Sequence, residues 1–356
     1  MRCIVRSLVI VSLLATPASL AFAAQRTFVS GIGSDSNACS LVAPCRSIAA
    51  ALLKTAPDGE IILQDSAGYG PVTIAQSVSI VAPPGVYGGI SIAAGAGITI
   101  TGTGINVTLK GLTINGQGGT TGIDFQGASL NSKLRIESVE IANLTGNGIT
   151  VSAGSSEVLV IDSIIRDTGG VGIEAMGSST ITVDRSRFDR NVGGIFVHDG
   201  PVLFLSNSVI ANSTVSGIRV VTPPGFSTTA SIESCSLTGA GFDAVYLDAQ
   251  GSSSTIDVTV SRSTLVGNQN GVGINASAGG GVATAVLKDN VISKNSNTGV
   301  YAQFAGATAI LSGNTITGNL TGVLSLSAGV LKSFGNNSVV NNTTNGTGSL
   351  TPVPSS

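Results

Sequence analysis

The amino-acid sequence predicts an all-β protein, a right-handed parallel β-helix of about ten or more coils. The first observation is a repeat, in which a glycine followed by an aliphatic residue recurs every 22–28 residues. The second is that a strand-like segment rich in β-branched residues precedes each pair, with Asn, Gly and Ser turns between them. The pairs are Gly122-Ile123, Gly148-Ile149, Gly172-Ile173, Gly194-Ile195, Gly217-Ile218, Gly271-Val272, Gly299-Val300 and Gly322-Val323, with Ala244-Val245 in the one remaining place.

One such unit cannot bury a core by itself. Units stacked as coils can, because parallel neighbouring strands bond backbone to backbone and cover one another. Crossover connections between parallel strands are right-handed, which gives the expected hand of the solenoid.

The composition excludes several other classes of protein. Hydrophobic residues make up 42% of the chain, charged residues only 10%, and there is no Trp. Disordered chains combine low hydrophobicity with high charge, and collagen needs glycine at every third position, so neither class fits. Lys and Arg number 17 against 19 Asp and Glu, without a basic run, so nucleic acid is not an expected partner.

Residues 1–24 are expected to be a signal peptide. "MRCIVR" is a basic start, "SLVIVSLLATPASL" is an apolar run, and "AFA" at 21–23 has the form of a cleavage site. The apolar run is too short to span a membrane, and no second long one follows. We therefore expect no transmembrane segment and a protein that is secreted, or located in the periplasm or at the cell surface.

Residues 25–60 are expected to form an N-terminal cap. Cys39 and Cys45 lie close together in "CSLVAPC", and an exported protein folds in an oxidising compartment. The sequence therefore predicts a Cys39–Cys45 disulfide.

The segment 46–83, "RSIAAALLKTAPDGEIILQDSAGYGPVTIAQSVSIVAP", resembles the entry to right-handed β-helix proteins of the pectate-lyase-like superfamily. The resemblance implies a short amphipathic helix that caps the first coil, here with Ile48, Leu52 and Leu53 on its apolar face and with Pro57 and Gly59 ending it. It says little about activity, because this fold carries lyases, hydrolases, esterases, adhesins and inert scaffolds.

Residues 61–342 are expected to form the solenoid, and residues 343–356 a flexible polar tail. Aligning the coils gives an inward aliphatic column: Ile141, Ile165, Phe188, Ile210, Leu237, Leu265, Ile292 and Ile316. Two positions before it stands an inward polar column: Ser163, Ser186, Ser208, Cys235, Ser263, Asn290, Asn314 and Asn337. Stacked Ser and Asn can hydrogen-bond along the column, and Cys235 is expected to be a buried free thiol.

The outward positions that follow each Gly-aliphatic pair carry the candidate site. Aromatic and charged residues are scarce, yet consecutive coils present Glu174, Phe196, His198, Arg219, Tyr246 and Asp248 on one face. Three coil steps span roughly 14 Å at sheet spacing, which is comparable to two or three sugar units. We predict ligand binding by Phe196, Arg219, Tyr246 and Tyr301, because aromatics stack on sugar rings and arginine pairs with uronate carboxylates. Cross-strand packing of the aromatics is the alternative interpretation.

Glu174, His198, Arg219 and Asp248 are the candidate catalytic residues. His198 is the only histidine and Asp199 follows it, but adjacent strand residues point to opposite faces. A His198–Asp199 pair is therefore expected only if "HDGP" is already turning. Glu174, Asp199 and Asp248 offer oxygen ligands that would suit calcium, and no other metal or cofactor is expected.

The enzyme signatures of the superfamily are missing, since "VHDG", "GIRV" and "GIDFQG" match them only in part. We therefore expect a monomeric, non-catalytic protein that binds polysaccharide or serves as a cell-surface or envelope scaffold. The alternative is a polysaccharide lyase or glycoside hydrolase acting on an acidic polysaccharide, with Arg219 as base or charge clamp. An ice-binding threonine array is a weaker idea, because only "ITITGTG" at 98–104 shows such a row.

Overall fold

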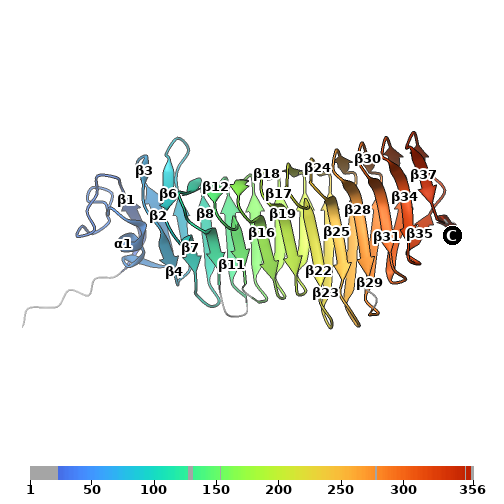
Figure 1. Ribbon diagram of the computed structural model, residues 1–356. Helices are drawn as coiled ribbons and strands as arrows, with labels where there is room; N and C mark the ends of the chain where they lie inside the picture. Colours follow the sequence, from blue (N-terminus) through green and yellow to red (C-terminus); the bar gives the residue numbers. More distant parts are fainter. Residues whose placement is uncertain (1–22, 127–130, 153, 277–278, 349, 354–356) are drawn as a thin grey trace, which may run out of the picture.

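The computed structural model describes residues 23–126, 131–152, 154–276, 279–348 and 350–353, and it has the expected right-handed parallel β-helix fold. Figure 1 shows an elongated solenoid whose coils follow one another from the N-terminal cap to the C-terminus. The expected signal peptide lies outside the described residues except for its last two positions. None of the described helices is long and apolar enough to cross a membrane.

The coils build three parallel sheets, named here A, B and C. Sheet A runs β1 (Ala24–Val29), β2 (Thr55–Leu63), β5 (Val78–Val81), β8 (Asn106–Lys110), β11 (Lys133–Glu137), β14 (Glu157–Ile161), β17 (Thr180–Asp184), β20 (Val202–Ser206), β23 (Ser227–Glu233), β26 (Thr255–Ser261), β29 (Val282–Lys288), β32 (Ala307–Ser312), β35 (Val330–Ser333) and β38 (Leu350–Pro352). Sheet B runs β3 (Ala67–Gly68), β6 (Gly88–Ile92), β9 (Leu112–Gly116), β12 (Glu140–Leu144), β15 (Ile164–Thr168), β18 (Arg187–Asp189), β21 (Val209–Ala211), β24 (Ser236–Thr238), β27 (Thr264–Val266), β30 (Val291–Ser293), β33 (Thr315–Thr317) and β36 (Ser338–Val340). Sheet C runs β4 (Val72–Ile74), β7 (Ala96–Ile100), β10 (Thr121–Phe125), β13 (Ile149–Val151), β16 (Val171–Met176), β19 (Gly193–His198), β22 (Ile218–Thr222), β25 (Asp243–Ala249), β28 (Asn270–Ala276), β31 (Thr298–Gln303), β34 (Thr321–Leu326) and β37 (Thr344–Thr347).

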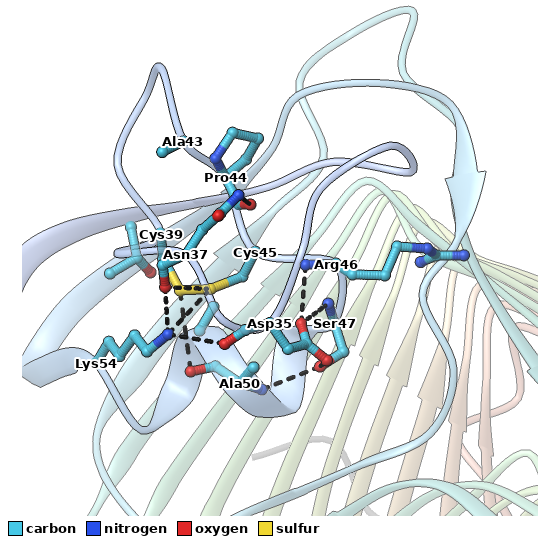
Figure 2. The surroundings of a disulfide bond; sticks show 12 residues. Asp35, Asn37, Cys39, Ala43, Pro44, Cys45, Arg46, Ser47, Ala50 and Lys54 are labelled. Carbon is cyan, nitrogen blue, oxygen red and sulfur yellow. Dashed lines mark hydrogen bonds between the residues drawn. A yellow bond between two sulfur atoms is a disulfide. The ribbon is translucent and has the colours of Figure 1, made fainter.

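The predicted Cys39–Cys45 disulfide is present in the cap. Figure 2 shows how the side chain of Asp35 ties the same loop together, accepting hydrogen bonds from the backbone N–H of Arg46 and of Ser47, each at 2.8 Å. The ammonium group of Lys54 donates to the carbonyl oxygen of Asp35 at 3.0 Å. The disulfide therefore belongs to a loop that polar contacts also hold against the first coil.

The capping helix α1 (Ile48–Leu52) is present but shorter than its sequence pattern suggests. Ser47 is its N-cap, and the Ser47 hydroxyl accepts a hydrogen bond from the backbone N–H of Ala50 at 3.1 Å. The expectation that Leu53 lies on the apolar face is wrong, since Leu53 is 86% exposed. The reason is that the chain leaves the helix at Leu53 and enters β2 at Thr55, before Pro57 and Gly59 could end it.

The inward aliphatic column is confirmed, because all eight of its side chains are at most 1% exposed. The polar column forms a hydrogen-bonded ladder: backbone N–H groups along it donate to the side-chain oxygen of the next coil at 2.9–3.2 Å. Cys235 is a buried free thiol, as predicted, and its Sγ donates to the carbonyl oxygen of Glu233, two residues earlier. Ser208 and Ser263, in the neighbouring coils, likewise donate to the carbonyl oxygen two residues earlier. Burial raises the pKa of this thiol to about 11.

A second polar ladder was not anticipated from the sequence. It follows the strands of sheet B, where the side-chain oxygen of each asparagine accepts from the backbone of the previous one at 2.9–3.1 Å. Its members are Asn268, Asn295, Asn319 and Asn342. Buried polar side chains, serine and asparagine in the first ladder and asparagine in the second, thus bond each coil to the next at the turns that leave sheet A and sheet B.

The region expected to be a flexible tail, residues 343–356, contains two strands. β37 pairs with β34, and β38 pairs with β35, so the stacking of coils continues to Pro352. Their side chains are exposed, since no further described coil covers them, but the backbone of the previous coil still offers a parallel edge to pair with.

Candidate functional site

The outer face of sheet C gathers the predicted strip in the expected order. The pairing register places Glu174, Phe196, Arg219 and Tyr246 side by side on β16, β19, β22 and β25. His198 and Asp248 lie two residues further along β19 and β25, with Val221 between them. Each of the candidate residues chosen from the sequence therefore lies on this face.

Arg219 is held between two aromatic rings. Its guanidinium carbon lies 5.2 Å from the ring centre of Phe196 and 6.0 Å from that of Tyr246, both within the range of cation–π attraction. Stacking on both sides fixes the plane of the guanidinium group without using its hydrogen-bond donors. Arg219 Nε is buried and has no hydrogen-bond partner within the described residues.

His198 stands at the end of the strip among carboxylates. Its ring stacks on Phe196 with centres 4.7 Å apart, and its Nε2 lies 3.6 Å from Glu174 Oε1. Glu174 raises the pKa of His198 above its usual range, and His198 in turn lowers the pKa of Glu174. Glu174 is also held by Asn147, whose side-chain amide donates to Glu174 Oε2 at 2.6 Å.

His198 and Asp199 do form a hydrogen-bonded pair, with 2.9 Å between Nδ1 and Asp199 Oδ2. The condition set for this pair, that "HDGP" is already turning, is met, because β19 ends at His198. Asp199 has a φ of +65°, in the left-handed region, and Gly200 follows it into the turn. The turn swings the carboxylate back onto the side of the strand that carries the imidazole.

Asp248 is engaged in amide contacts at a distance from His198. Asn275 donates to its Oδ1 at 2.7 Å, and Gln250 donates to its Oδ2 at 2.8 Å. No group of three or more His, Cys, Asp or Glu side chains among the described residues is placed to hold a metal ion, and calcium binding by Glu174, Asp199 and Asp248 stays a prediction. Glu174 contacts His198 and Asn147, and Asp248 contacts the two amides.

Asp243 is the site residue that sequence analysis missed. It begins β25, is only 6% exposed, and its Oδ1 has no hydrogen-bond partner in the described part of the chain. Burial raises its pKa to about 6, although the side chains of Asn270 and Tyr301 oppose that shift. A signal was available: this is the coil in which Ala244 replaces the repeated glycine, and a charged residue precedes it.

Tyr301, expected to be a ligand contact, leans across one coil toward Asp243. A Cβ atom built on Gly273, its neighbour in the register, would lie 2.4 Å from the Tyr301 hydroxyl. Glycine at 273 therefore leaves the space that the tyrosine occupies. Arg219, Asp243, Tyr246 and Tyr301, with Val215, Ser216 and Phe242, line one hollow of about 310 Å³.

A smaller hollow lies on the other side of Arg219. It measures about 160 Å³ and shares Val215, Ser216 and Arg219 with the first, with Phe196 in its lining. The two hollows together follow the strip over several coils. The strip is therefore a shallow groove with aromatic walls and not a flat face.

The buried polar side-chain atoms that lack a partner in the described chain all belong to this face. They are His198 Nε2, Arg219 Nε, Asp243 Oδ1 and Asn275 Oδ1. They lie on β19, β22, β25 and β28, which are consecutive strands of sheet C. All four atoms are buried, so a molecule bound on the surface of sheet C does not reach them in this conformation.

Comparison with known proteins identifies the architecture. A family model described as "Right handed beta helix region" matches residues 96–222 and 224–350. No curated protein matches the sequence.

Among solved structures, a polygalacturonase from Erwinia carotovora ssp. carotovora has a TM-score of 0.57 at 13% identity, over 86% of this chain and 95% of that one. A mutant of the periplasmic alginate epimerase AlgG has a TM-score of 0.56 at 14% identity, over 75% of this chain. The match covers 64% of the epimerase, so this chain spans less than two thirds of that protein's length. Likeness at these identities shows the fold alone.

Proposed function

This chain belongs to the right-handed β-helix family, and from that premise we propose that it is a secreted, non-catalytic protein that binds polysaccharide along the outer face of sheet C. The Cys39–Cys45 disulfide supports export, because such bonds persist in oxidising compartments. The polygalacturonase and the alginate epimerase are named for polysaccharide substrates, which supports this ligand class.

The observation that carries the proposal is the row of Phe196, Arg219 and Tyr246 on consecutive strands of one face, with the guanidinium group between the two rings. Two hollows run alongside this row. A polysaccharide offers hydroxyl groups at intervals along an extended chain, together with ring faces that stack on aromatic side chains. It can therefore contact several of these side chains at once, which a small ion cannot.

Binding is tested by isothermal titration calorimetry with xylan, pectate, alginate and hyaluronan. We expect at least one polymer to bind, and Tyr246→Ala to weaken that binding about tenfold, because the ring that stacks on Arg219 is lost. Phe204→Ala is the matched control: Phe204 is a 48% exposed aromatic on β20, on sheet A. If no polymer binds, a scaffold role replaces the proposal. If both variants weaken binding equally, the site is not on sheet C.

The second candidate function is a polysaccharide lyase or glycoside hydrolase, and one specific observation favours it. His198 is bonded through Nδ1 to Asp199, and its Nε2 lies 3.6 Å from Glu174 Oε1. An imidazole held between two carboxylates, which raise its pKa, is an arrangement suited to proton transfer.

Chain length separates the two functions. Each polymer is incubated with the protein, with and without calcium, and measured by size-exclusion chromatography. A non-catalytic protein leaves every polymer at its starting size. Shortening of one polymer, abolished in a folded Arg219→Ala variant, would establish the enzyme instead.

A further inference from the structure

We propose that the smaller hollow beside Arg219 is a subsite for an acyl group, such as an acetyl group, carried by a sugar of the bound polysaccharide. The apolar end of the acyl group occupies the hollow, and its carbonyl oxygen accepts a hydrogen bond from the guanidinium group of Arg219. The inference rests on the proposed function, since it names a substituent of the ligand for the same groove.

The hollow lies where one coil departs from the repeat. In the surrounding coils, the residue two places before the repeated aliphatic one carries a side chain: Val171, Ser216, Asp243, Asn270 and Thr298. In the coil between those of Val171 and Ser216, the same position is Gly193, which pairs with Val171 in the register. A Cβ atom built on Gly193 would lie 2.9 Å from Val171 Cγ1, and both residues line the hollow. Glycine at 193 therefore leaves open a space that a side chain would otherwise enter.

Most of the walls of this hollow are apolar. Val171, Val192, Ile195 and Phe196 line it together with Val215, which is 37% exposed, so part of the wall is accessible from solvent. The hollow measures about 160 Å³. An apolar cavity of about 150 Å³ can hold benzene, so an acyl group of a few carbon atoms fits. A sugar ring suits these walls poorly, because its hydroxyl groups would lose their hydrogen bonds to water there.

Arg219 gives the hollow one polar end. It is half-buried, and its guanidinium carbon lies 5.2 Å from the ring centre of Phe196, which also lines the hollow. The other arginines that the structure describes each donate to or pair with a carboxylate or carbonyl oxygen. Arg219 makes ring contacts instead, and no hydrogen bond or ion pair joins it to a described residue. Of its nitrogens only Nε is buried without a partner, so the two Nη groups are the donors open to a ligand.

The charges around the hollow favour an uncharged acceptor. Glu174 is the neighbour of Phe196 in the register, on the side away from Arg219. A carboxylate in the hollow would bring a second negative charge toward Glu174 and would lose its water against apolar walls, which is costly for an ion. The carbonyl oxygen of an ester or amide carries only a partial negative charge. It complements the Arg219 guanidinium group without that cost, while the attached methyl group suits the apolar walls.

The experiment compares xylan, pectate and alginate by calorimetry, each freed of esters with mild alkali or chemically O-acetylated. We expect the wild type to bind an acetylated polymer about tenfold more tightly than its unesterified form, because a small apolar group in an apolar pocket is discriminated by that order. Gly193→Thr fills the hollow and should bind the two forms equally. The φ of Gly193 lies outside the left-handed region, and the atom nearest to a Cβ there is the end of the Val171 side chain, so this variant is expected to fold.

Gly68→Thr is the matched control, because it adds the same side chain on sheet B, where a Cβ atom meets nothing within 4 Å. It should keep the wild-type preference for acetylated polymer, and circular dichroism checks that both variants are folded. Hyaluronan, whose acetyl groups are amides, distinguishes the two sources of an acetyl group. If Gly193→Thr binds hyaluronan more weakly than the wild type does, the subsite also takes amides; if it does not, the subsite takes esters alone.

The outcomes separate this inference from the proposed function. If acetylation does not tighten binding to the wild type, or if Gly193→Thr keeps the preference for acetylated polymer, the acyl subsite is wrong while polysaccharide binding stands. If no polymer binds to the wild type in either form, the proposed function fails, and the subsite fails with it.

Discussion

Replacing Asp243 by asparagine should stabilise the protein, and the gain should grow with pH. Asp243 is buried at the start of β25 with an unpartnered oxygen, so its ionised form is poorly solvated in the folded state. Burial raises its pKa from 3.8 to about 6. Asparagine has nearly the same shape and carries no charge, so the substitution removes the cost of ionisation and leaves the packing in place.

The size of the effect follows from the shift in pKa. A rise of about two units, at 1.36 kcal/mol for each, corresponds to about 3 kcal/mol. Because the folded protein holds this proton more tightly than the unfolded chain, the cost is absent below pH 3.8. It develops between pH 3.8 and about 6 and is complete above that range. The free energy of unfolding of the variant should therefore exceed that of the wild type most clearly at pH 8.

The assay is urea unfolding of both proteins at pH 4 and pH 8, followed by circular dichroism. The difference in free energy of unfolding between variant and wild type should rise by about 2.5 kcal/mol from pH 4 to pH 8, because about 0.5 kcal/mol is already present at pH 4. Glu174→Gln is the opposite control, because the pKa of Glu174 is lowered by His198, so that substitution should cost stability at pH 6, where Glu174 is ionised and His198 is protonated, and less at pH 4. A difference for Asp243→Asn that does not change with pH would refute the reasoning.

Three further substitutions test other parts of the structure. Asn314→Ala should lower the free energy of unfolding by about 3 kcal/mol or more, measured in urea, because it strands buried partners in the polar ladder; a loss below 1 kcal/mol would contradict the role of the ladder. Cys235→Ser should change it by less than about 1 kcal/mol, because serine fills the same column in neighbouring coils; a large loss would show that the thiol is specifically required. Arg219→Lys should weaken polysaccharide binding about tenfold in calorimetry, since lysine keeps the charge but loses the planar stack; unchanged affinity would mean that charge alone matters.

The fold and the register were predictable because the core of a solenoid is repetitive. Glycine-aliphatic pairs and inward columns recur in every coil, so one correct alignment places every strand of sheet C. Phe196, Arg219 and Tyr246 follow from that alignment alone, and the structure pairs them as expected. Inward positions obey the same packing constraint in each coil, so the recurrence of aliphatic residues at these positions can be recognised in a single sequence.

The contacts that depend on departures from the repeat were not predictable. The His198–Asp199 pair required the left-handed turn at Asp199, which strand alternation does not reveal. Asp243 lies before the Gly-aliphatic position and not after it, outside the columns chosen as outward. Tyr301, two coils away, reaches Asp243 across Gly273 because that one coil has no side chain there.

The outer face of sheet C differs from the other two faces in the side chains that it gathers. Sheets A and B face solvent too, yet Phe196, Arg219 and Tyr246 lie side by side on three consecutive strands of sheet C, with the guanidinium group between the two rings. A solenoid can carry such a row, because neighbouring coils support each strand through backbone pairing that does not depend on outward side chains. A scaffold needs no arginine held between two aromatic rings beside two hollows, whereas the proposed polysaccharide ligand would use both the ring faces and the guanidinium group.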